Sequence, residues 1–176
     1  MISRLSRGLA VAAAIFAGTA ALAQEESSNR VAANTDWSVF VEEDPVQCWS
    51  VSAPKTEEFF RDGNPVSAST GDVLLFVSYQ PDEGVQGQVS YNGGYPFGDG
   101  TTVSMEIGGS SFDLFTEGEW AWAASPEDDA SIVAAMKRGA EAKLTGRSGR
   151  GTQVVHTFSL LGFTAAVEEA DSRCSG

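Results

Sequence analysis

The amino-acid sequence predicts a mainly β protein: an antiparallel β-sandwich or barrel-like domain with two short helices. Short segments that alternate apolar and polar residues recur along the chain, and turn-forming residues separate them. Helical periodicity is confined to about residues 125–138 and 163–173. Many short strands with one or two helices are typical of a single β-rich domain. We therefore expect residues 35–176 to form one such domain.

The N-terminal residues have the three parts of a secretory signal peptide. Arg4 and Arg7 supply positive charge, residues 9–22 form an apolar run, and Ala21-Leu22-Ala23 is a small-x-small cleavage site. The run is shorter than the roughly 20 residues that a membrane-spanning helix needs. We predict that residues 1–23 are a cleaved signal peptide, and that the mature protein is periplasmic or secreted with no integral membrane span.

The chain is strongly acidic, with 11 Lys and Arg residues against 24 Asp and Glu residues and a net charge of −13. Cleavage of the signal peptide removes Arg4 and Arg7 and so changes the net charge to −15. Such a surface repels phosphate backbones. The sequence therefore predicts that nucleic acid is not a partner.

The first mature segments are assigned from their pattern. Residues 24–34 are polar and lack periodicity, so we expect a disordered lead-in. Strands are predicted over residues 37–41 and 47–51, with a turn at Asp44-Pro45 between them. Residues 73–79 are almost continuously apolar, which predicts a central strand covered on both faces.

A hairpin is predicted around Gly108-Gly109, a dipeptide that suits two-residue turns with positive φ. Apolar residues alternate on both sides of this turn. With the turn at this position they meet across the ladder. The expected pairs are Val103 with Leu114, Met105 with Phe112, and Ile107 with Ser110.

The first predicted helix has clear end signals. Ser125 suits the N-cap, Pro126 the first helical position, and acidic residues fill the first turn. Lys137 and Arg138 suit the last turn, and Gly139 suits the position after it.

The two cysteines, Cys48 and Cys174, predict one disulfide because the export signal implies an oxidising compartment. The apolar stripe of the helix over residues 163–173, extended by four residues, reaches Cys174, which therefore faces the domain. In the chain-entropy model, a disulfide that closes a loop of this length stabilises the folded protein by on the order of 4–5 kcal/mol. Neither cysteine has a second Cys or His at ligand spacing, so we predict no metal site and no cofactor.

His156 is the single histidine, and it shares a strand face with Val154 and Phe158. A buried structural histidine is the expected interpretation. A general base would need a nucleophile and an orienting acid, and the sequence singles out neither. We therefore predict no catalytic residue.

The glycine-rich segment 146–152 nearly matches a phosphate-binding loop, but it lacks the lysine and lies between two predicted strands. A hairpin loop is the simpler interpretation. Arg147 and Arg150 remain candidate contacts for an anion or a partner.

Aromatic residues give two further hypotheses. Tyr95 and Phe97, in the loop over residues 92–100, either form a contact surface or fold back to close one end of the sandwich. Trp120 and Trp122 share one strand face, where a core position is expected and a carbohydrate platform is the alternative.

Several short blocks, in their order and spacing, resemble the invasion-associated locus B family of bacterial envelope proteins. The resemblance spans nearly the whole mature chain. The blocks are Asp36-Trp37-Ser38-Val39, Gly93-Gly94-Tyr95-Pro96, Ala134-Ala135-Met136-Lys137-Arg138-Gly139, the segment 146–152, and the segment 157–166.

The resemblance implies a small exported β-rich protein. The family has no catalytic motif whose residues could be matched to positions of this sequence. Many members have a cysteine close to the position of Val41. Its absence here leaves Cys48 without a nearby partner and favours pairing with Cys174. His156 occupies a position where the resemblance leads us to expect an acidic residue.

These observations together predict a non-catalytic accessory protein that binds another envelope protein. Two alternatives stay open. One is a hydrolase of envelope polymers that uses carboxylates between Glu117 and Asp129, which would need a cleft with convergent polar groups. The other is a small-ligand carrier with a pocket inside the sandwich.

Overall fold

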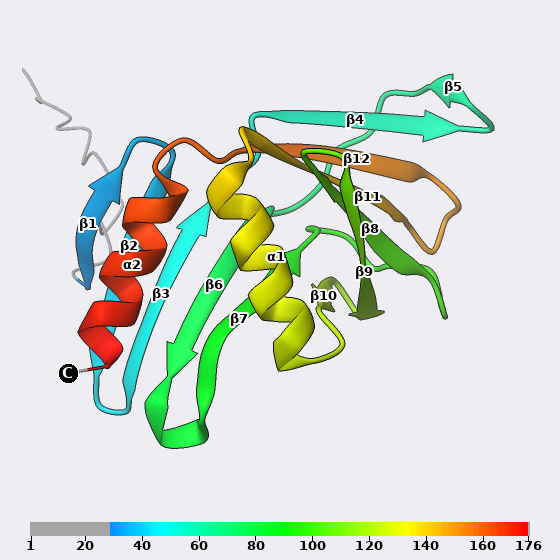
Figure 1. Ribbon diagram of the computed structural model, residues 1–176. Coiled ribbons are helices and arrows are strands. Elements are labelled where there is room, and N and C mark those ends of the chain that lie inside the picture. Colours follow the sequence, from blue (N-terminus) through cyan, green and yellow to red (C-terminus); the bar gives the residue numbers. More distant parts are fainter. Residues whose placement is uncertain (1–28, 176) are drawn as a thin grey trace, which may run out of the picture.

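The computed structural model describes residues 29–175 (Figure 1). The predicted signal peptide, residues 1–23, lies outside the described residues. The elements in chain order are β1 (Arg30–Asn34), β2 (Trp37–Glu43), β3 (Val46–Ser52), β4 (Thr56–Arg61), β5 (Asn64–Pro65), β6 (Leu74–Gln80), η1 (Pro81–Glu83), β7 (Val85–Asn92), β8 (Thr102–Ile107), β9 (Ser110–Glu117), β10 (Trp120–Trp122), α1 (Pro126–Arg138), β11 (Glu141–Arg147), β12 (Gln153–Ser159) and α2 (Phe163–Cys174).

The described strands form one 12-stranded sheet, in the order β1-β2-β3-β6-β7-β10-β9-β8-β11-β12-β4-β5. Neighbouring strands pair in antiparallel fashion, as the β6–β7 and β11–β12 hairpins illustrate. The predicted mainly β class with two helices is confirmed. The strands belong to a single sheet that curls on itself, so the two faces of the core come from two halves of one sheet.

The curl brings β7 opposite β12, although four strands separate them in the sheet order. Tyr91 of β7 meets Phe158 of β12 edge to face, with ring centroids 6.1 Å apart. The buried side chains lie between these two halves. The largest of them are Trp37, Tyr91, Phe158, Phe163, Leu75, Met105, Leu114, Ile132, Met136 and Leu144.

Both helices pack against the inner face of the sheet half that contains β2, β3, β6 and β7 (Figure 1). Ser125 caps α1 as predicted, because its Oγ accepts a hydrogen bond of 3.2 Å from the N–H of Asp128. Cys174, the last residue of α2, forms the predicted disulfide with Cys48 of β3, and their Cα atoms lie 5.9 Å apart. The bridge therefore ties the C-terminal helix to the middle of the sheet.

The β8–β9 hairpin has the predicted register, with Met105 opposite Phe112. Gly108 and Gly109 both adopt positive φ, as this turn requires. The prediction that residues 73–79 are covered on both faces is wrong. In β6 the side chains alternate between buried and half-buried, because helices and the opposite half of the sheet cover only the inner face.

The predicted disordered lead-in, residues 24–34, is wrong for its second part, because residues 30–34 form β1. This strand pairs with β2, with Asn34 opposite Trp37. Its side chains are exposed or half-buried, so the segment has no apolar pattern from which a strand is recognised. Residues 24–28 lie outside the described residues.

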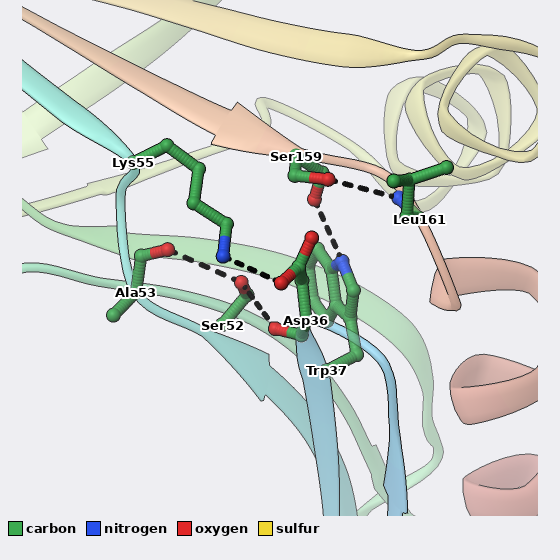
Figure 2. Close-up of polar contacts among 7 residues, drawn as sticks. All are labelled: Asp36, Trp37, Ser52, Ala53, Lys55, Ser159 and Leu161. Atoms are coloured by element: carbon green, nitrogen blue, oxygen red, sulfur yellow. Dashed lines mark hydrogen bonds and ion pairs between the residues drawn. The ribbon is translucent and has the colours of Figure 1, made fainter.

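Figure 2 shows the Trp37 junction, formed by Asp36, Trp37, Ser52, Lys55 and Ser159, where the start of β2 meets the end of β12. The indole Nε1–H of Trp37 donates to the carbonyl oxygen of Ser159 at 2.9 Å. Ser52 Oγ donates to the carbonyl oxygen of Asp36 at 2.7 Å, and Lys55 Nζ contacts Asp36 Oδ1 at 2.5 Å. The junction joins segments more than 100 residues apart, since Trp37 and Ser159 are separated by 122 positions.

We predict that the Trp37 junction makes stability depend on pH in the acidic range. The Lys55 ammonium and the Ser159 hydroxyl hold the pKa of the Asp36 carboxyl below its ordinary value of 3.8, against the opposite effect of burial. A lowered folded-state pKa stabilises the fold above the unfolded pKa, and this contribution disappears as the pH falls through the folded pKa. Asp36→Asn should therefore lower the melting temperature at pH 7 and have no effect below the folded pKa.

Thermal denaturation of wild type and Asp36→Asn between pH 7 and pH 2 measures this difference. Asp113→Asn, which replaces an exposed aspartate on β9, is the matched control and should leave the curve unchanged. A difference between wild type and Asp36→Asn that stays constant over the whole range would contradict the prediction.

Candidate functional site

A groove lies where β4, the Tyr95-Pro96 loop and the β11–β12 loop come together, and we call it the arginine groove. Its volume is about 590 Å³. The groove is lined by Phe59, Arg61, Ser67, Ala68, Ser69, Thr70, Gly94, Tyr95, Pro96, Ser148, Gly149, Arg150, Thr152 and Val154. Its lining contains two arginines and no carboxylate, on a chain whose net charge is −13.

The arginines of this region have different roles. Arg61 donates from Nη2 to Thr152 Oγ1 at 2.7 Å, so its guanidinium is anchored at the groove wall. Arg150 is exposed and has no hydrogen bond or ion pair within residues 29–175. Arg147, a predicted contact residue, instead donates to the carbonyl oxygen of Gly151 at 3.0 Å and so braces its own loop. Of the two arginines singled out in the sequence, Arg150 lines the groove, and Arg61 lines it without having been singled out.

The segments around the arginine groove are fixed by backbone hydrogen bonds. Gly149 N–H donates to Pro96 O at 3.0 Å, and Gly98 N–H donates to Arg147 O at 2.9 Å. On the opposite side, Gly71 N–H donates to Gly94 O at 2.8 Å. The glycine-rich segment 146–152 is thus a hairpin loop held against the Tyr95-Pro96 loop, as its position between strands predicted.

Tyr95 and Phe97 fold back into the protein, which confirms one of the two interpretations drawn from the sequence. Both are buried, and their rings meet at a centroid distance of 4.8 Å. A Cβ atom at Gly146 would lie 2.5 Å from Tyr95 Oη and 2.9 Å from Phe97 Cε1, so these two rings require glycine there. Phe97 is therefore not a surface contact, which corrects its assignment as one, whereas Tyr95 still contributes to the groove wall.

A buried polar cluster lies behind Tyr95. His156 is fully buried, and its Nδ1 lies 2.5 Å from Tyr91 Oη. Its Nε2 lies 3.3 Å from Glu57 Oε2 without forming a hydrogen bond. Glu57 in turn accepts a hydrogen bond of 2.6 Å from Thr70 Oγ1, and Thr70 lines the groove. The histidine is thus a core residue, as the sequence predicted, and its hydroxyl partner is Tyr91.

Burial favours the neutral forms of the histidine and of the two tyrosines. It lowers the pKa of His156 more than the Glu57 carboxylate raises it, and it raises the pKa values of Tyr91 and Tyr95. The polar contacts of His156 within residues 29–175 are Tyr91 and Glu57. Neither is the serine or cysteine nucleophile that a hydrolase triad pairs with histidine.

The outer surface of the sheet carries a set of aromatic side chains that we call the aromatic face. It comprises Phe40, Trp49, Phe76, Phe115, Trp120 and Trp122. The rings form pairs with centroid distances of 5.6 Å on β2 and β3, 5.8 Å between β6 and β10, 6.2 Å within β10, and 5.5 Å between β9 and β10. Phe115 is 47% exposed and Trp120 is 36% exposed.

The core position expected for Trp120 and Trp122 is wrong. Ala121, between them, is fully buried, so β10 directs its alanine inward and its tryptophans outward. Two residues at a spacing of two share a face, but the spacing does not say which face is covered. The neighbouring strands did indicate in the sequence that aromatic residues lie on the outer face. In β6, for example, Phe76 lies between Leu75 and Val77, which already supply the inner apolar face.

Three rings of the aromatic face, those of Trp49, Phe76 and Trp120, line a hollow of about 240 Å³. Its lining holds no charged side chain, and consists of Gln47, Cys48, Trp49, Phe76, Ser78, Tyr79, Gln80, Ser90 and Trp120. The lining of this hollow is thus uncharged, within a strongly acidic protein.

The carboxylates considered for acid–base chemistry have structural contacts. Asp129 is buried and accepts a hydrogen bond of 2.8 Å from the N–H of Val89, which joins α1 to β7. Asp128 accepts a hydrogen bond of 2.9 Å from Ser125 Oγ at the start of α1. Glu117 and Glu119 are exposed around the β9–β10 turn.

Within residues 29–175, no cluster of three or more His, Cys, Asp or Glu side chains is arranged to hold a metal ion. None of the helices in the same range combines the length and the apolar character that crossing a membrane requires.

Comparisons with known proteins support the resemblance seen in the sequence. A family model described as "Invasion associated locus B (IalB) protein" matches residues 98–171. A comparison with curated proteins found no match. The fold is similar to the crystal structure of invasion associated protein B from Bartonella henselae, with a TM-score of 0.56 and 16% sequence identity, over 82% of this chain and 98% of that chain.

The matched segment contains β8 to β12, all of α1, and α2 up to residue 171. It also contains the glycine-rich loop of the arginine groove. The structural match extends the likeness to most of the described domain. Sequence pattern, family match and fold agree, and the predicted resemblance is confirmed: residues 98–171 match the invasion associated locus B (IalB) family model, and the fold is similar to that of invasion associated protein B.

Proposed function

We propose that this protein is an exported, non-catalytic accessory protein of the bacterial envelope that binds another envelope protein through its aromatic face. The observation that carries the proposal is the set of six paired aromatic rings on the outer surface of the sheet. Aromatic residues are enriched at the centres of protein interfaces, and exposed apolar patches of this kind mark interaction sites.

The composition of the aromatic face favours a protein partner. Tryptophan and phenylalanine supply large contact areas with only two side-chain torsions each, so little conformational entropy is lost on binding. Ring contacts such as that between Trp120 and Trp122 already restrain the side chains. The polar groups of Gln47, Ser78 and Ser90 line the hollow and offer hydrogen bonds within an otherwise apolar contact.

The export signal and the disulfide support the cellular location. The sequence of residues 1–23 has the composition of a signal peptide, and the Cys48–Cys174 bridge is typical of an oxidising compartment. The proposed place of action is therefore the periplasm or the cell exterior.

Affinity purification of the tagged mature protein from envelope extracts in mild detergent tests the proposal. Wild type should recover a stoichiometric partner, and the double variant Phe115→Ser/Trp120→Ser should recover at least about tenfold less, as expected for the loss of two central aromatic contacts. Leu161→Ser is the matched control, because Leu161 is a 61% exposed apolar residue outside the aromatic face.

Recovery of the same partner by the aromatic double variant would contradict the proposal, as would the absence of any stoichiometric partner. Size-exclusion chromatography with light scattering provides the complementary readout. A wild-type dimer that the double variant converts to a monomer would show that the aromatic face binds a second copy of this chain instead.

A further inference from the structure

We infer that the arginine groove binds a small ligand with an anionic head group, a carboxylate or a phosphate, and an apolar body. The groove is formed by β4, the segment over residues 67–70, the Tyr95-Pro96 loop and the β11–β12 loop. It uses none of the residues of the aromatic face, so this inference is independent of the proposed function.

The distribution of charge selects an anion. The described residues Lys55, Lys137 and Arg173 each form an ion pair with a carboxylate. Arg61 and Arg150 have no such partner within residues 29–175, and both line the same groove. Two guanidinium groups without an ion-pair partner, in a lining that holds no carboxylate, raise the local potential of this groove on a protein of net charge −13.

The available hydrogen-bond donors fit an oxyanion. A guanidinium carries five N–H donors in a planar fork, and Arg61 directs one of its nitrogens to Thr152 Oγ1. This contact fixes the side chain and leaves the other donors for a ligand, in the geometry that carboxylates and phosphates accept. Hydroxyl groups of Ser67, Ser69 and Ser148 line the same groove and add further donors.

The remaining wall of the groove is apolar. Phe59 and Val154 lie side by side on β4 and β12, with their Cα atoms in register. Tyr95 and Pro96 line the groove as well. A ligand with an anionic head at the arginines would therefore place an aromatic or aliphatic body against these side chains. Such a division between a polar end and an apolar body is usual in small-molecule sites.

The groove is also preformed and of suitable size. The bonds from Gly149 to Pro96 and from Gly71 to Gly94 fix two of the segments that form it. Thr152 N–H donates to Ser148 Oγ at 3.1 Å and fixes the loop that carries Arg150. A volume of about 590 Å³ falls within the usual range for small-molecule sites, roughly 300–1,000 Å³. Preorganisation lowers the entropy lost on binding.

Isothermal titration calorimetry of the mature protein with three probes tests the inference. Phenyl phosphate and 3-phenylpropionate carry the two anionic head groups, and 3-phenylpropanamide is the uncharged analogue. At least one anion should bind, about tenfold or more tightly than the amide, because charge-assisted hydrogen bonds to arginine are lost with the charge. The stronger of the two anions identifies the head group that the groove prefers.

Arg61→Gln and Arg150→Gln should each weaken binding of the preferred anion by about tenfold or more. Arg138→Gln, at the exposed end of α1 and outside the groove lining, removes the same charge and should leave binding unchanged. Arg150 makes no hydrogen bond or ion pair within residues 29–175, so its variant should fold normally even if Arg61→Gln is destabilised. Equal binding by wild type and Arg150→Gln, equal affinity for anion and amide, or no binding of either anion would overturn the inference.

Discussion

Replacement of both cysteines, as Cys48→Ala/Cys174→Ala, is expected to lower the free energy of unfolding by about 4 kcal/mol. The bridge joins residues 126 positions apart, so it restricts most of the unfolded mature chain. In the folded protein it fixes the end of α2 against β3. For a domain of this size, such a loss corresponds to a decrease in melting temperature on the order of 10 °C.

Urea denaturation of oxidised wild type, reduced wild type and the double variant measures this effect. Cys48 and Cys174 are both buried, so wild type should be reduced in denaturant and refolded with reductant present. Reduced wild type and the variant should then have similar stability, below that of oxidised wild type. Equal midpoints for the oxidised and reduced protein, or two free thiols found by mass spectrometry, would contradict the prediction.

The sequence predicted best those features that local chemistry determines. The Gly108-Gly109 turn dictates the register of β8 and β9, since only one pairing places apolar residues opposite each other. The ends of α1 follow from Ser125, Pro126 and the basic last turn, because a helix needs partners for its free N–H groups and a favourable charge at each end. The apolar stripe of α2 likewise predicted that Cys174 faces the core.

Features that depend on which surface is covered were not predictable. Trp120 and Trp122 satisfy the same alternation whether their strand face is inside or outside. The helices and the opposite half of the sheet, which cover the inner face, decide it. The strand β1 was missed because its contribution is backbone pairing at the edge of the sheet, which leaves no apolar pattern.

The candidate sites illustrate the same limit. Arg150 was recognisable because it lies in an unusual glycine-rich loop, whereas Arg61 lies on a plain, largely polar strand more than 80 positions earlier. The antiparallel pairing of β4 with β12 brings the two arginines to one groove. That pairing joins distant segments, and a single sequence contains no local signal for it.

The second large effect is expected at Trp37. The variant Trp37→Ala should lower the free energy of unfolding by about 3–5 kcal/mol, because it leaves a cavity in the core. Trp37 is 1% exposed, and its ring packs edge to face on Phe163 of α2 with centroids 4.8 Å apart. The substitution also leaves the carbonyl oxygen of Ser159 without its indole donor.

Trp120→Ala is the matched control for Trp37→Ala, because it removes the same side chain from the outer surface of the sheet. Trp120 is 36% exposed, and its loss should cost about 1 kcal/mol or less. Trp37→Phe keeps most of the packed ring and should fall between the two variants. Urea denaturation of the three variants measures their free energies of unfolding and so gives the order of their stabilities. If Trp120→Ala were as destabilising as Trp37→Ala, the Trp120 ring would be part of the core. The aromatic face would then not be available as a binding surface.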